Sequence, residues 1–232
     1  MGILSLFIGF AMYVSESDFG NVPLHGAASF ISRNQVAYDY DEEWLDESAY
    51  TQAGNTPNLT DYGVDVSYKV EQVYPGSQVL ARIRECEETI TRAYFSFPYL
   101  HRTQLKSLKF LWTKNTQRGL GGESSIHLKC NDISAAELTA VFVHEMGHIV
   151  DTGLMEGQSS AGPSHFIDKR TSVFEDDPSI DFYTISWKNA VTKLSKSRAN
   201  DFVTGYAMSD PFEDFAESYN FYLLHGSQFR YL

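Results

Sequence analysis

Apolar residues alternate with polar ones in some parts of this chain and recur at helical spacing in others. Residues 64–70 alternate, which predicts a half-buried strand. Residues 77–94 carry their apolar side chains on one stripe, which predicts a helix of about 18 residues. Residues 105–112 and 125–130 predict two more strands, separated by a glycine-rich turn at residues 117–122.

The next element, residues 134–151, is apolar nearly all round and predicts a helix buried in a domain core. Ser134 opens a capping-box pattern at its start, and Gly153 lies just past the expected end. The order strand, helix, strand, strand, helix predicts an α+β fold. Residues 152–205 predict a long polar connection that contains a helix within residues 180–194.

The buried helix contains an H-E-x-x-H motif formed by His144, Glu145 and His148. On a helix the two histidines lie one turn apart on the same face, so both imidazoles can bind one Zn²⁺. Glu145 then lies beside the metal, where it can accept a proton from zinc-bound water as a general base. The alternative is a buried helix with two incidental histidines, because the motif also occurs by chance.

A catalytic zinc site needs a third protein ligand, with the fourth position left to water. A third histidine in the metzincin arrangement is excluded, because Asp151 and Leu154 occupy the corresponding positions. Residues 210–224 predict a capped helix on which Glu213 and Glu217 share one face. One carboxylate can bind zinc while the other hydrogen-bonds a ligand histidine. Alternatively, Glu213 belongs to a capping box and Glu217 is exposed.

Tyr206 lies seven positions before Glu213, in a stretch that ends in Phe-Ala-Glu217. This stretch and the H-E-x-x-H helix resemble the gluzincin family that includes the catalytic domain of anthrax lethal factor and the bacterial Pro-Pro endopeptidases. The resemblance covers less than a fifth of the chain. It implies that Glu213 is the third zinc ligand, that Tyr206 stabilises the oxyanion, and that Glu217 and Asp151 support the ligands.

The same resemblance implies a zincin-like metallopeptidase fold. In such a fold a mixed N-terminal sheet and helices lie above the active-site cleft, and a mainly helical subdomain lies below it. Residues 1–60 are then an N-terminal apolar run and an acidic, loop-rich segment, followed by the catalytic domain at residues 61–232. The upper subdomain is expected over residues 61–152 and the lower one over residues 153–232.

Composition and charge limit the classes of function. The chain of 232 residues has a net charge of −12, which argues against a nucleic-acid-binding surface, since that requires a basic patch. Residues 1–14 form an apolar run with the length of a signal-peptide core, and membrane association is expected only through them. We therefore expect a secreted or cell-surface bacterial protein. Cys86 and Cys130 show no metal or disulfide-framework spacing, so two buried thiols are the default and one disulfide is the alternative.

The expected activity is hydrolysis of peptide bonds by a zinc metalloendopeptidase. Its substrate is a peptide or protein in extended form, which could pair with residues 124–130 if that strand is a sheet edge. The first rival is an inactive zinc-binding surface or interaction module with the same fold, although such a module would have no reason to keep both Glu145 and Tyr206. The second rival is a structural zinc closed by four protein ligands. The candidates to complete that sphere are His165, His225 and Asp151.

Overall fold

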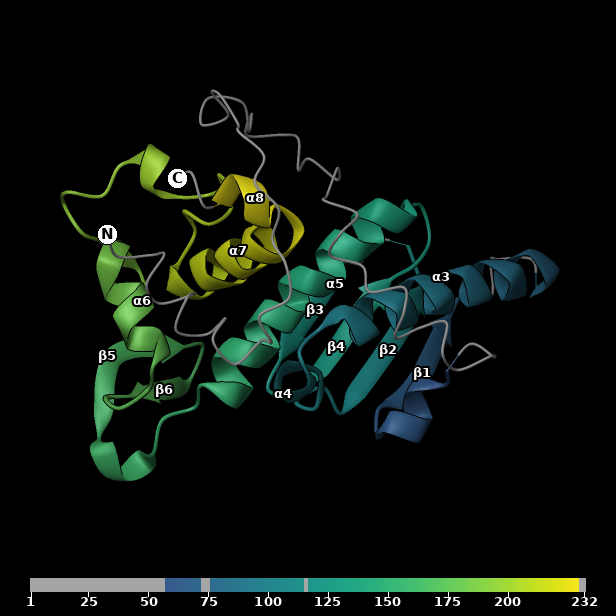
Figure 1. Cartoon of the computed structure of the whole chain (residues 1–232), viewed down its shortest axis with the longest axis horizontal. Coiled ribbons are helices and arrows are strands. Elements are labelled where there is room, and N and C mark those ends of the chain that lie inside the picture. The colour runs from purple at the N-terminus through teal and green to yellow at the C-terminus, as the bar shows by residue number, and fades with distance from the viewer. Residues whose placement is uncertain (1–56, 72–75, 115–116, 230–232) are drawn as a thin grey trace. The chain divides into compact units, whose positions relative to one another are not determined.

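The computed structural model describes residues 57–71, 76–114 and 117–229, which combine helices and strands in an α+β fold (Figure 1). These residues fall in two compact units. The first, residues 57–154, contains both motif histidines and is called the histidine unit below. The second, residues 155–229, is called the glutamate unit after Glu213. The predictions for the N-terminal apolar run and for the acidic segment lie outside the described residues.

The histidine unit is built on a four-stranded sheet. Its strands are β1 (Asp65–Val70), β2 (Ser107–Trp112), β3 (Gly119–Gly122) and β4 (Ser125–Lys129), in the order β1-β2-β4-β3. The strands β1, β2 and β4 confirm the predictions made from alternation and pair in parallel, whereas β3 is antiparallel to β4. Along β2 and β4 every second side chain is buried, because one face of each strand packs into the core.

Two predictions about this sheet are wrong. The glycine-rich segment at residues 117–122 is not a turn throughout, since residues 119–122 form β3. Glycine has a low strand propensity, and pairing with β4 overrides that preference here. The segment at residues 124–130 is not a sheet edge, because β4 lies between β2 and β3 and pairs with both. Among the described strands, β3 is the edge on this side of the sheet.

The helices of the histidine unit are α3 (Gly76–Ser96), α4 (Tyr99–Arg102) and α5 (Ala135–Ile149), together with the short 3₁₀ helix η2 (Leu59–Tyr62). The helix α5 packs against α3 and lies along β3 and β4 (Figure 1). Within the described part of the chain, no helix combines the length and apolarity needed to cross a membrane.

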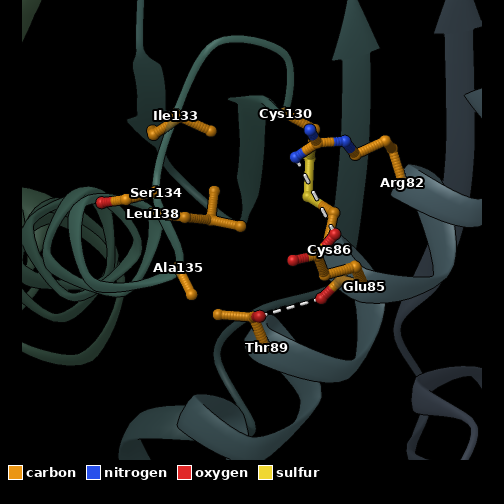
Figure 2. A pocket seen from close by; sticks show the side chains of 9 residues that line it. All are labelled: Arg82, Glu85, Cys86, Thr89, Cys130, Ile133, Ser134, Ala135 and Leu138. Carbon is orange, nitrogen blue, oxygen red and sulfur yellow. Dashed lines mark hydrogen bonds and ion pairs between the residues drawn. A yellow bond between two sulfur atoms is a disulfide. The ribbon is translucent and has the colours of Figure 1, made fainter.

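A disulfide joins Cys86 on α3 to Cys130, which follows β4. The prediction of two buried thiols is therefore wrong. Both side chains are buried, as expected, but the fold brings residues 44 positions apart in sequence into bonding distance. Figure 2 shows the disulfide bordering a pocket between α3 and the first turn of α5, towards which Leu138 points. The disulfide thus ties the segment that leads into the histidine helix to α3.

The prediction that the histidine helix ends just before Gly153 is wrong. Instead, α5 continues into one π-helical segment, η3 (Val150–Leu154), which includes this glycine. A Cβ added at Gly153 would lie 3.0 Å from the carbonyl oxygen of Glu123 in the β3–β4 turn. Gly153 therefore allows a close approach between helix and hairpin rather than ending the helix.

The glutamate unit contains two small hairpins and three helices among its described residues. Its elements are β5 (Pro163–Asp168), β6 (Thr171–Phe174), α6 (Ser179–Ser186), β7 (Trp187–Asn189), β8 (Thr192–Lys193), α7 (Pro211–Leu224) and α8 (Gly226–Phe229), with short 3₁₀ helices at Ser159–Ala161 and Ala199–Asp201. The predicted long connection is thus largely structured. The prediction that residues 180–194 contain a helix is confirmed by α6, but its placement around Trp187 is wrong, because α6 ends at Ser186 and Trp187 begins β7. The Trp187 indole is buried and donates a hydrogen bond to Asp214 on α7, which holds this segment in the core.

Candidate metal centre

The H-E-x-x-H motif lies in the second half of α5. The helix begins where predicted, because the Ser134 hydroxyl accepts a hydrogen bond from the Glu137 amide at 3.1 Å. Its side chains are mostly buried, which confirms the prediction of a core helix. His144 is buried, His148 is half-buried, and their ring centroids lie 4.9 Å apart. The two imidazoles therefore lie close enough to share one metal ion.

Glu145 is buried and lies against the edge strand β3 rather than in solvent. A Cβ added at Gly121 would lie only 2.8 Å from its Oε2 atom, so the carboxylate fills the space that a side chain would need. The carboxylate thus lies against the edge of the sheet.

The residues that follow the motif remain helical and buried. Asp151 is 1% exposed within η3, and the Thr152 hydroxyl donates a hydrogen bond of 2.7 Å to the His148 carbonyl. Short π-helical segments often occur at functional sites. Asp151 thus belongs to the buried part of this helix and not to its surface.

The predicted helix with Glu213 and Glu217 is confirmed as α7. Asp210 caps it by accepting hydrogen bonds from the amides of Phe212 at 3.0 Å and Glu213 at 2.9 Å, and Pro211 occupies the first turn. Glu213 is half-buried in that first turn. The Tyr206 hydroxyl donates a hydrogen bond of 3.0 Å to Glu213 Oε1, although the tyrosine ring itself is 55% exposed.

Sequence reasoning missed Thr204, which connects Glu217 to the Tyr206 loop. Its hydroxyl donates a 2.5 Å hydrogen bond to Glu217 Oε2 and accepts one from the Ala207 amide at 3.0 Å. The loop is therefore attached to α7 through both Glu213 and Glu217. The only signal for this role in the sequence is that threonine hydroxyls commonly bond to nearby backbone groups.

A buried acid beside Glu213 also escaped prediction. Asp214 is 4% exposed and accepts a 2.9 Å hydrogen bond from the Trp187 indole. Burial raises the pKa of Asp214 to about 7, and the indole hydrogen bond opposes that rise. Asp214 thus anchors α7 within the glutamate unit through Trp187, whereas its neighbour Glu213 contacts Tyr206.

His144, His148 and Glu213 form a group of three candidate ligands that could hold a metal ion, each offering one ligand atom. Two imidazoles and one carboxylate are the donor set of catalytic zinc sites that leave a position for water. Within the described residues this group includes neither His165, which is exposed on β5, nor His225, which is buried at the end of α7. Among the residues that the structure describes, the group therefore has three candidate ligands, one fewer than the four protein ligands of a structural zinc site.

Residues 136–228 match the model of a protein family described as "putative zinc-binding metallo-peptidase". This region contains both the H-E-x-x-H motif and the glutamates of α7. No curated protein and no solved structure matches the chain. The family match and the His-His-Glu group together identify zinc as the cofactor and support peptidase activity.

Proposed function

We propose that this protein is a zinc-dependent endopeptidase of the gluzincin type, in which His144, His148 and Glu213 hold the metal. The observation that carries the proposal is the His-His-Glu group with a buried glutamate directly after its first histidine. The donor set fits zinc, because imidazole nitrogen and carboxylate oxygen are both common zinc ligands. The proposed roles of Glu217 and Asp151 are to orient these ligands through hydrogen bonds.

Bound zinc supplies Lewis acidity, which polarises the scissile carbonyl and makes a water molecule acidic near neutral pH. In this proposal Glu145 accepts the proton of the attacking water. It then delivers that proton to the leaving amine as the C–N bond breaks, so the carboxylate returns to its starting state. Its position next to the first ligand and against β3 supports this role.

Tyr206 is proposed to donate a hydrogen bond to the oxyanion that forms when water adds to the carbonyl. Its hydroxyl donates to Glu213, so it must leave that acceptor when substrate binds. Two features make this exchange feasible. The ring is 55% exposed, and the loop that carries it remains attached to α7 through Thr204.

Because β4 is an internal strand, the proposed site at which an extended substrate pairs with the sheet is the edge strand β3. The Lys129 amide donates to the Arg118 carbonyl, which makes these residues a hydrogen-bonded pair at the start of the β3–β4 ladder. Hydrogen-bonded and non-hydrogen-bonded pairs alternate in an antiparallel ladder, so the backbone polar groups of Gly119 and Gly121 face away from β4. An extended peptide could pair with these groups by adding a strand to the sheet.

We also propose that the protein is exported to the cell surface or beyond. The disulfide between Cys86 and Cys130 supports this location, because disulfides form and persist mainly in oxidising compartments.

The proposal is tested by incubating the zinc-loaded protein with a peptide library and identifying cleavage products by mass spectrometry. The wild type should cut peptides, and a chelator should abolish cutting. Glu145→Gln should keep zinc but lose roughly 10²–10⁴-fold in rate, as expected for removal of a general base. The matched control is Glu156→Gln, since Glu156 is an exposed acid on a loop.

Two outcomes would contradict the proposal in different ways. Near-normal cleavage by Glu145→Gln would exclude Glu145 as the base. Zinc binding without cleavage of any peptide by the wild type would favour the inactive zinc-binding module.

A further inference from the structure

We propose that Gly119 and Gly121 are positioning residues for Glu145. The edge strand β3 has no side chain at either position, and the Glu145 carboxylate occupies the space left by both. The strand and the carboxylate therefore hold each other in one arrangement. The catalytic meaning of this arrangement rests on the proposed role of Glu145 as the general base, whereas the packing itself does not.

The packing leaves no room for a methyl group. A Cβ added at Gly119 would collide with Glu145 Oε1, and it would lie 2.8 Å from Cδ of the same side chain and 2.7 Å from Val141 Cγ1. A Cβ added at Gly121 would lie 2.8 Å from Glu145 Oε2 and 2.9 Å from the Glu145 carbonyl oxygen. Real Cβ atoms essentially never approach other heavy atoms within 3.0 Å. Each carboxylate oxygen is therefore matched to one glycine.

The strand cannot move away to relieve such a collision, because it is attached to α5 on both sides of the glycines. Before β3, the Arg118 Nε atom lies 3.0 Å from Oε1 of Glu137 in the first turn of α5. The same guanidinium donates a 2.7 Å hydrogen bond to the Asp132 carbonyl, just before the helix. After β3, the Glu123 carbonyl packs closely on Gly153 in η3.

This arrangement has a direct consequence for catalysis. Glu145 is 6% exposed, and its carboxylate cannot rotate towards β3 without meeting the backbone. A catalytic group must stay close to its productive geometry, since a displacement of about 1 Å can cost roughly 10²-fold in rate. The two glycines thus fix the general base without contacting the reacting atoms through a side chain.

The strand also contains a matched control. Gly122 lies on β3 as well, but a Cβ added there would have no heavy atom within 4 Å. Its φ angle is not among the positive values found in the described backbone, so alanine introduces no backbone strain. Gly122→Ala therefore makes the same chemical change on the same strand without the collision.

The decisive experiment is a double-mutant cycle measured by thermal unfolding of the zinc-free protein. Overpacking should make Gly119→Ala lower the Tm of the wild type by roughly 3–10 °C. In the Glu145→Ala background the same substitution should lower the Tm by clearly less, with Val141 accounting for the remainder. Gly122→Ala should leave the Tm within about 1 °C in both backgrounds. Equal losses from Gly119→Ala in both backgrounds would overturn the proposal.

Kinetics then test the positioning role. Gly119→Ala and Gly121→Ala should keep one zinc per chain and lower kcat by roughly 10–100-fold. The KM should change much less, because alanine keeps the backbone groups proposed to bind substrate. Gly122→Ala should keep the wild-type kcat. A wild-type kcat in both Gly119→Ala and Gly121→Ala would overturn the positioning role. If Gly119→Ala does not fold, Gly121→Ala carries the kinetic test. Its thermal coupling should be smaller, because a Cβ at this position also lies 2.9 Å from the Glu145 carbonyl oxygen, which Glu145→Ala keeps.

The two proposals fail separately. Thermal coupling in a protein that cleaves no peptide would reject the proposed function and keep the packing between Glu145 and the glycines. Peptide cleavage without thermal coupling would support the proposed function and reject the packing between Glu145 and the glycines.

Discussion

The two helices that carry the candidate zinc ligands have different surroundings. The helix α5 is buried along most of its length, is led into by a disulfide-bonded segment, and holds Glu145 against a strand. The helix α7 presents a half-buried Glu213 in its first turn, hydrogen-bonded to the exposed Tyr206. The histidine unit therefore holds groups that must keep their positions during the proposed reaction. The glutamate unit carries the one group, Tyr206, that must change partners.

The contacts that stabilise each unit follow the same division. Near α5 they are a disulfide, a close helix–strand packing and a salt bridge between Arg118 and Glu137. Near Tyr206 they include hydrogen bonds that Thr204 and the tyrosine itself donate to carboxylates on α7. A hydrogen bond can be exchanged for one to a substrate at little net cost, whereas a disulfide or a packed backbone cannot.

Removing ligands tests whether both helices serve one ion, and it should produce the largest effect. His148→Ala and Glu213→Ala should each lower zinc affinity by more than the roughly 10–100-fold expected for a group that only orients a ligand. Glu217→Ala should fall within that range, and Glu156→Ala should have no effect. Competition with a fluorescent chelator gives the affinities. Wild-type zinc affinity in Glu213→Ala would show that α7 supplies no ligand through Glu213, and it would contradict the proposed His-His-Glu site.

Breaking the disulfide should lower the free energy of unfolding of the protein through the histidine unit. Both cysteines of the chain lie in this unit, and they close a loop of 44 positions. Replacing both with serine should lower the free energy of unfolding by about 4 kcal/mol, because the unfolded chain regains loop entropy. This loss corresponds to a fall in Tm of roughly 8–16 °C. Calorimetry of the zinc-free variant and of the zinc-free, oxidised wild type gives the value, and the reduced wild type is the control that should resemble the variant. An unchanged Tm would show that packing alone holds the segment before α5.

The contrast between local and distant contacts also explains which features the sequence predicted. The N-caps of α5 and α7 depend on residues within one helix, and both are confirmed. The strand β3 was missed because glycines hide the period, and pairing with β4 supplies what local propensity lacks.

The remaining errors arise from contacts between distant segments. The disulfide depends on how α3 and β4 pack, which residue spacing does not reveal. The end of α6 depends on the hydrogen bond between Trp187 and Asp214, 27 positions away. The choice of Glu213 over Glu217 as the candidate third ligand rests on a family resemblance, since both glutamates share one face of the predicted helix and their spacing does not decide between them.

Replacing Tyr206 tests the proposal that its hydroxyl changes its hydrogen-bond partner during the reaction. Tyr206→Phe removes the hydroxyl that donates to Glu213 and is proposed to donate to the oxyanion. The expected result is a loss of roughly 10²–10³-fold in kcat, with zinc binding and Tm close to wild type, since the ring is more than half exposed. Steady-state kinetics and zinc titration measure both. An equal loss of zinc affinity would instead assign Tyr206 to holding Glu213 in place.

The buried imidazole of His101 in the histidine unit should give the smallest effect, a pH dependence of the free energy of unfolding. His101 on α4 is 7% exposed, and burial lowers the pKa of its imidazole to about 4. The unfolded chain therefore binds one more proton than the folded chain between about pH 4 and the ordinary histidine value of 6.5. Stability from this source is complete above pH 6.5 and is lost as pH falls towards 4, by at most roughly 3 kcal/mol.

Urea unfolding of the zinc-free protein at pH 7 and pH 4.5 measures this loss without a contribution from zinc binding. The stability of His101→Gln should fall less between the two pH values than that of the wild type. His165→Gln is the matched control, because His165 is exposed on β5 and should leave the pH dependence unchanged. If His101→Gln and the wild type lost the same stability, the acid sensitivity would have to come from groups other than this buried imidazole. The histidine unit would then accommodate the charged form of His101, although burial of the imidazole is expected to disfavour that form.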